Sequence, residues 1–99
     1  GGLAAVGLQE TLDAANAGRI HLLIIHRNLT CPGWHCPSCG HLGADEPPLC
    51  PVCSHHTTAV ELGEALVNRA LQTDASVELI EPDPRLDAYD GMGVFLRYW

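Results

Sequence analysis

The sequence predicts a small α/β domain in which helices pack on a mixed sheet of at least three strands. Two amphipathic segments alternate with three short apolar segments, which is typical of helices packed on a sheet. A strand–helix–strand order within this pattern predicts a right-handed parallel crossover. The length of 99 residues fits one domain with one hydrophobic core.

Residues 3–17 are expected to form the first helix. Apolar residues recur at three- and four-residue steps and would form the buried stripe: Ala5, Leu8, Leu12 and Ala15. Polar residues for the solvent side lie between them: Glu10, Asp13 and Asn16. Gly7 lies inside this segment and would mark a close packing contact. Gly18 is expected to end the helix in the left-handed conformation.

The second helix is expected over residues 58–71. Thr58 and Glu61 fit a capping box at its start. Arg69 near its end suits the negative pole of the helix dipole. Its buried face would contain Leu62, Leu66, Val67, Ala70 and Leu71.

Three segments predict strands. The unbroken apolar run at residues 21–25 suits a strand that is covered on both faces. Residues 76–81 predict the next strand, and residues 85–91 are expected to form a polar loop or one helical turn. Residues 94–98 predict the last strand, with Val94, Leu96 and Tyr98 on one face.

The composition excludes several functional classes. Twelve acidic residues against five basic ones, all arginine, give a net charge of −7, so the chain lacks the basic face that non-specific phosphate contacts need. No apolar run reaches the roughly 18 residues of a membrane span. The first residues lack a basic signal-peptide region, and the missing initiator Met suggests a fragment of a longer chain.

Between residues 26 and 56 the helical and strand periods disappear, and Pro and Gly are frequent. A structureless loop of about thirty residues is unusual in a compact domain. All five cysteines fall in this stretch, which favours a metal-organised insertion at residues 31–56 in a reducing, cytoplasmic compartment. The whole chain, residues 1–99, would then be one domain that carries this insertion.

Two CxxC pairs define the candidate ligands: Cys36 with Cys39, and Cys50 with Cys53. Each pair lets two thiolates approach one ion from a tight turn, and two such turns complete a tetrahedral S₄ shell. We therefore predict one structural Zn²⁺. Four cysteines fill the shell and leave no position for a catalytic water, which argues against metal catalysis.

Other interpretations of the cysteines stay open. Disulfides, a redox CxxC pair and a [4Fe–4S] cluster are alternatives, although the clustering, the sequence context and the spacing favour zinc. Cys31 is expected to be a free thiol outside the shell, with competition for the metal as the alternative. His35, His41 and His55 flank the ligand turns and are expected to be polar loop residues, with exchange for a cysteine ligand as the alternative.

Three stretches of the chain resemble the carboxy-terminal domain of the archaeal and eukaryotic class-one peptide chain release factors and of their bacterial relatives. They are residues 6–24, residues 62–70 with 75–80, and the closing Asp-Gly-Met-Gly-Val-Phe-Leu-Arg-Tyr at residues 90–98. Archaeal members also carry a paired-CxxC insertion between the first strand and the second helix, where this chain has Cys36 to Cys53.

The resemblance implies a mixed sheet sandwiched by helices, related to ribosomal proteins that bind kink-turn RNA. In release factors this domain contacts a translational GTPase and the stalk region of the ribosome, and relatives act in ribosome rescue. Catalysis there belongs to a Gly-Gly-Gln loop in another domain. Gly1-Gly2 is followed by Leu3, so the resemblance implies no peptidyl-tRNA hydrolase activity for this chain.

The sequence thus favours a non-catalytic, zinc-stabilised protein-interaction domain of a termination or rescue protein. Direct binding of structured, kink-turn-like RNA is the alternative, and it would require Arg19, Arg27 and Arg97 to cluster in space. A redox enzyme that uses Cys31 is the weakest reading, because no cation adjoins that thiol in the sequence.

Overall fold

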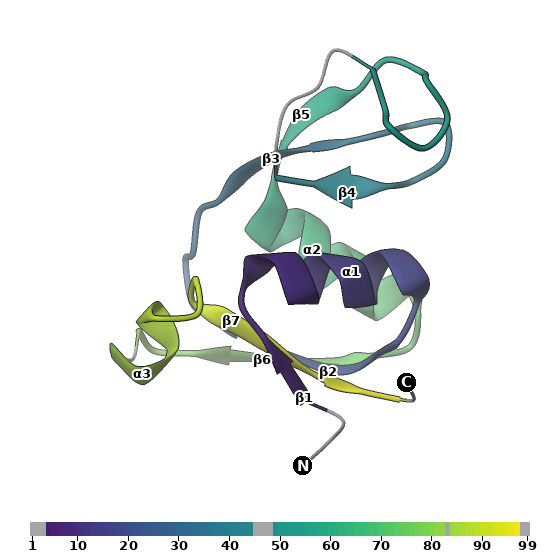
Figure 1. Cartoon of the computed structure of the whole chain (residues 1–99). Coiled ribbons are helices and arrows are strands. Elements are labelled where there is room, and N and C mark those ends of the chain that lie inside the picture. The colour runs from purple at the N-terminus through teal and green to yellow at the C-terminus, as the bar shows by residue number, and fades with distance from the viewer. Residues whose placement is uncertain (1–3, 45–48, 83, 98–99) are drawn as a thin grey trace.

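Two β-sheets and three helices form the part of the chain that the computed structural model describes, residues 4–44, 49–82 and 84–97 (Figure 1). Along the chain the elements are β1 (Ala4–Val6), α1 (Leu8–Ala17), β2 (Ile20–His26), β3 (Pro32–His35), β4 (Leu42–Gly43), β5 (Thr58–Glu61), α2 (Leu62–Gln72), β6 (Ser76–Ile80), α3 (Pro84–Asp87) and β7 (Met92–Leu96). The larger sheet has the strand order β1-β7-β2-β6, and the smaller has the order β4-β3-β5.

The larger sheet is mixed, as expected. β2 runs parallel to β6, with α2 in the connection between them, whereas β7 pairs antiparallel with both β2 and β1. This confirms the mixed α/β class and the parallel crossover, which arises because the returning strand needs a long connection over one face of the sheet.

The hydrophobic core lies between this sheet and the two long helices, which lie side by side over one face (Figure 1). Its most buried side chains are Leu12 of α1, Leu62, Leu66 and Ala70 of α2, Ile20, Leu23 and Ile25 of β2, and Met92, Val94 and Leu96 of β7. The predicted burial of Leu62, Leu66 and Ala70 is confirmed. Leu71 is 58% exposed, so its predicted burial was wrong.

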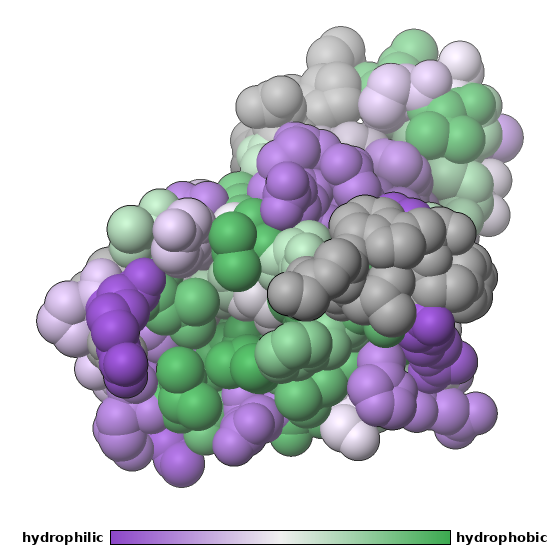
Figure 2. Space-filling model, turned by 60° about the horizontal axis from the view of Figure 1, so that its bottom comes forward, coloured by the Kyte–Doolittle hydropathy of each residue, from purple (hydrophilic) through white to green (hydrophobic). Residues whose placement is uncertain are grey.

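The opposite face of the larger sheet is not covered by α1 or α2, so the implied sandwich is present on one side only in the described residues. Leu22 pairs with Phe95, and Ile24 pairs with Gly93, which places these residues on the uncovered face. Phe95 is 45% exposed. The view turned to bring the bottom of Figure 1 forward shows hydrophobic surface there (Figure 2).

The first helix begins later than predicted. Residues 4–6 form β1 because they pair with β7, and α1 starts only at Leu8. Gly7 lies between the two elements at φ 92°, a conformation that glycine adopts without steric penalty. The predicted role of Gly7 as a packing contact within a helix was therefore wrong. Gly18 ends α1 at φ 68°, as predicted.

The second helix also begins later, and its cap differs from the predicted capping box. Thr58 to Glu61 form β5 against β3, and Glu61 itself is the residue that caps α2. Its carboxylate accepts the backbone N–H groups of Gly63 and Glu64, and also that of Cys31 at 2.9 Å. One acidic side chain thus joins the start of α2 to the start of the insertion.

The closing glycine-rich segment supports the start of α1. The backbone N–H of Leu8 donates to Asp90 Oδ2 at 2.9 Å, which caps a helix whose own preceding residue has no side chain. Gly91, at φ 75°, leaves room for the ring of His26, since a Cβ there would lie 3.0 Å from His26 Nδ1. The last strand is Met92–Leu96 with Val94 and Leu96 buried as predicted, and Tyr98 lies outside the described residues.

Replacing Asp90 with Gly is expected to lower the free energy of unfolding by about 1 kcal/mol, the usual cost of losing a helix cap. Gly accepts the φ of 61° at this position, so the loss reports the carboxylate rather than backbone strain. The matched control is Asp74→Gly, since Asp74 is exposed and has nearly the same φ of 62°. Equal urea midpoints for the two variants would contradict the capping role.

Candidate metal centre

Two turns of the same shape carry the four candidate ligands. In the first knuckle, residues 36–41, the N–H of Gly40 donates to the carbonyl of Cys36 at 2.8 Å. In the second knuckle, residues 50–55, the N–H of Ser54 donates to the carbonyl of Cys50 at 2.9 Å. Gly40 and Ser54 have φ values of 83° and 64°, so Ser54 adopts the left-handed conformation that glycine provides in the first knuckle.

The four sulfur atoms converge on one point. The Sγ atoms of the two CxxC pairs all lie within 4.8 Å of one another, with 3.4 Å from Cys36 to Cys53 and 3.6 Å from Cys39 to Cys50. A tetrahedral ZnS₄ site with bonds of 2.3 Å requires sulfur separations of about 3.8 Å. The arrangement can therefore hold one metal ion, and its donor set is the soft thiolate set that zinc accepts.

The turns also prepare the sulfur atoms to carry charge. The backbone N–H of Cys39 approaches Cys36 Sγ at 3.5 Å, and the N–H of Val52 approaches Cys50 Sγ at 3.4 Å. The first of these contacts has the largest effect on Cys36, and together with further hydrogen bonds, which outweigh desolvation, it lowers the pKa of this thiol to about 6. For Cys39, the backbone N–H of His41 favours the thiolate, but desolvation and the neighbouring sulfur atoms raise the pKa to about 12. A bound cation would favour the thiolate form of these clustered sulfur atoms.

Two side chains that the sequence did not single out fix the first knuckle to the helices. Asn16 of α1 donates from Nδ2 to the carbonyl of Leu42 and accepts the N–H of Leu42 at Oδ1, both at 2.9 Å. This amide occupies the edge of β4 as a neighbouring strand would. Arg69 of α2 donates from Nη2 to the carbonyl of Gly40. The sequence predicted Asn16 as a solvent-facing residue and Arg69 as a residue that compensates the helix dipole. Their partners Leu42 and Gly40 are far away in the sequence, so no local pattern indicated these contacts.

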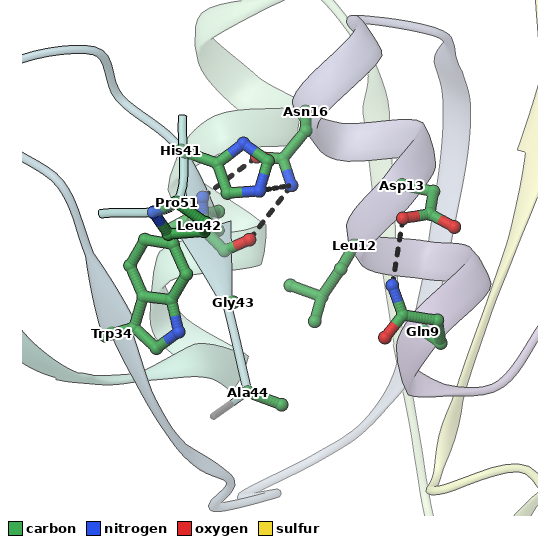
Figure 3. A pocket seen from close by; sticks show the side chains of 10 residues that line it. All are labelled: Gln9, Leu12, Asp13, Asn16, Trp34, His41, Leu42, Gly43, Ala44 and Pro51. Carbon is green, nitrogen blue, oxygen red and sulfur yellow. Dashed lines mark hydrogen bonds between the residues drawn. The ribbon is translucent and has the colours of Figure 1, made fainter. Parts of the chain in front are cut away.

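Trp34 of β3 packs against the knuckles and faces α1 across a cleft. Its ring is 4% exposed, lies against Cys36 and Cys50, and stacks on His41 with a centroid distance of 5.5 Å. A cleft of about 290 Å³ separates this ring from α1 and is also lined by Pro51 of the second knuckle (Figure 3). Gly43 contacts the indole, since a Cβ at Gly43 would lie 2.4 Å from it. Trp34 therefore forms one wall of the cleft, opposite α1.

The remaining candidates lie outside the group of four sulfur atoms. Cys31 is half-buried against the main core, and His41 stacks on Trp34. The ring nitrogen Nδ1 of His55 lies 3.3 Å from Cys53 Sγ, where it contacts a candidate ligand. His35 lies in β3 opposite Thr58. Among the described residues, the four cysteines are the cluster whose ligand atoms converge.

Cys31 is expected to react slowly with iodoacetamide at pH 8. Burial, together with the carboxylates of Glu61 and Asp90, raises the pKa of this thiol, so a smaller fraction is ionised than in an unfolded chain. We expect the rate in the metal-loaded chain to be about tenfold or more below that of the same thiol in urea. Mass spectrometry of the modified peptide measures it, and Cys31→Ser identifies the product. A rate equal to that of the unfolded chain would contradict this expectation.

The arginines proposed for RNA contact do not form one cluster. The N–H of Arg97 donates to the carbonyl of Arg19 at 2.8 Å, so these two residues are neighbours. Arg27 lies beyond the other end of β2 and pairs with Glu81 at 3.2 Å. The guanidinium of Arg97 is also bound to the backbone carbonyls of Ile20 and Thr73.

The fold and the site together define a mixed α/β domain with a cluster of four cysteines that can hold a metal ion. No protein-family model matches the sequence, and no curated protein matches it. The structure is similar to the C-terminal domain of a peptide chain release factor from Methanosarcina mazei, with a TM-score of 0.66 and 18% sequence identity. The similarity covers 98% of this chain and 71% of that one, so the expected resemblance is confirmed for the fold. None of the described helices has the length and apolar character that crossing a membrane requires.

Proposed function

We propose that this chain is a non-catalytic protein-interaction domain of a release-factor-like protein that acts on the ribosome in translation termination or rescue. The observation that carries the proposal is the fold similarity over 98% of the chain to the C-terminal domain of a release factor. The acidic composition, with a net charge of −7, supports a protein surface or a basic ribosomal surface as the partner. A translational GTPase and the ribosome are the partners we propose, in the cytoplasm.

We further propose that Cys36, Cys39, Cys50 and Cys53 hold one structural Zn²⁺. Convergence of their sulfur atoms within 4.8 Å supports this assignment. Four thiolates on one Zn²⁺ add a charge of −2 to the chain. The ion would stabilise the insertion at residues 31–56 within a single domain of residues 1–99, and a filled shell leaves no position for a reacting water.

Structured RNA remains the alternative ligand through a fold relationship to the kink-turn-binding ribosomal proteins. The dispersed arginines and the acidic charge disfavour it. Phosphate contacts need several cations on one face, and Arg27 and Arg97 are both engaged with other groups of this chain.

A binding assay distinguishes the two functions. The tagged, zinc-loaded chain is incubated at low salt with purified ribosomes, and separately with a purified translational GTPase, and co-sedimentation or pulldown is measured. The same chain is titrated to micromolar concentration against a kink-turn RNA in a gel shift. We expect retention by the ribosome or the GTPase and no RNA shift. An RNA shift without either protein interaction would support the alternative, and absence of all three would refute both.

A further inference from the structure

The two knuckles are attached to the rest of the chain in different ways. The first knuckle and the strand β4 that follows it are held by the amide of Asn16 and by the guanidinium of Arg69. β3, which leads into this knuckle, pairs along four residues with β5, which follows the second knuckle, so this pairing is common to both and the two side-chain anchors make the difference. None of these attachments involves a metal ligand atom, so they do not require the ion.

The second knuckle and its flanking residues, 49–56, have no such anchors among the described residues. The hydrogen bonds of this segment are internal, as in the donation from the N–H of Cys50 to the carbonyl of His55 at 2.7 Å. The pairing of Leu49 with His56 is also internal. Its contacts beyond itself are the packing of Cys50 on Trp34, the edge of the cleft at Pro51, and the sulfur atoms that face the first knuckle.

The sulfur contacts hold the second knuckle firmly only when a cation joins them. Without an ion, the contacts of 3.4 Å from Cys36 to Cys53 and 3.6 Å from Cys39 to Cys50 join sulfur atoms, which are weak donors and acceptors and contribute little. The packing of Cys50 on Trp34 is then the main remaining attachment, and one such contact contributes little against the conformational entropy of eight residues.

We propose that metal binding acts on one side of the module: the first knuckle keeps its position without the ion, and the second knuckle is released when the ion is removed. This inference rests on the proposed metal site. Val52 and Leu49 are 62% and 44% exposed, so the second knuckle carries apolar side chains at the surface. They are held in a fixed position only in the metal-loaded chain.

Hydrogen exchange of the complete chain tests the inference. The zinc-loaded chain and the chain depleted with a chelator under reducing conditions are compared by mass spectrometry or by NMR. We expect the amides of Cys50 and Ser54 to exchange about a hundredfold faster, or more, after depletion. The amide of Leu42 and the paired amides of β3 should change by less than about threefold.

Variants of the anchors make the test specific. In the double variant Asn16→Ala and Arg69→Met, the first knuckle loses both side-chain anchors, so depletion should also expose the Gly40 amide to fast exchange. Asn16→Ala removes the acceptor for the N–H of Leu42 and the donor to its carbonyl, whereas the Gly40 amide donates to the carbonyl of Cys36 and reports the knuckle itself. Asn68→Met changes an exposed neighbour on α2 and should behave as the parent chain does.

Metal content separates the failure of this inference from failure of the proposed site. A chain with one zinc whose two knuckles lose protection equally, or not at all, would overturn the one-sided release and leave the site in place. A chain that binds no metal would refute the site itself. The inference is supported if depletion removes protection from the second knuckle alone in the parent chain and from both knuckles in the double variant.

Discussion

The Cys50→Ser variant is expected to lose its bound metal. Cys50 is 2% exposed and its sulfur faces Cys39 at 3.6 Å, so the substitution removes one of four converging donors. A serine hydroxyl stays protonated near neutral pH and does not replace a thiolate. Structural zinc contributes an apparent binding free energy of about 10–16 kcal/mol in small zinc domains, which makes this the largest effect expected for a single substitution.

Metal analysis and NMR measure the outcome for this variant. We expect the zinc content to fall from one ion per chain to nearly none. The NMR chemical shifts of residues 49–56 should move towards those of an unfolded chain. The signals of β2 and α2 should persist, because their core lies outside the module. Cys31→Ser is the matched control and should retain one zinc. Full metal content in Cys50→Ser would refute the assignment of this ligand.

The Leu66→Ala variant is expected to lose about 2–5 kcal/mol of folding free energy. Leu66 is fully buried on α2 and packs within the main core, so the smaller side chain leaves a cavity as well as losing burial. Domains of this size have a total stability of about 5–15 kcal/mol, and such a loss would leave part of the population unfolded.

Urea unfolding of the zinc-loaded chain, followed by circular dichroism, measures this loss. Leu71→Ala is the control, since Leu71 lies on the same helix but is 58% exposed. We expect the control to change the free energy of unfolding by less than about 1 kcal/mol. Equal losses in the two variants would mean that α2 is not packed on the core through Leu66.

The elements predicted correctly from the sequence are those in which the local pattern and the tertiary packing agree. β2 is an unbroken apolar run, and the interior of α2 has its apolar residues on one face, so each pattern led to the observed structure. The errors fall at residues 4–6 and 58–61, which form strands through partners far away in the chain. Such pairing leaves no local signal, and a helical pattern extends through both segments.

The same distinction applies to the metal module. The CxxC spacing predicted the group of converging sulfur atoms because each turn is local. The anchors Asn16 and Arg69 contact backbone carbonyls 26 and 29 residues away, and a carbonyl has the same chemistry at every position. The strands β3 and β4 were missed for a related reason, since Pro and Gly hide a short strand whose pairing is fixed by the module.

The strand order of the larger sheet constrains how the chain folds as it is synthesised. Of the described strands, β7 is the last to leave the ribosome, yet it lies in the interior of the sheet, between β1 and β2. Until residues 92–96 have emerged, β1 lacks its neighbour and β2 has an open edge on one side. The sheet therefore closes only after nearly the whole described chain is available, in one late step that joins its beginning to its end.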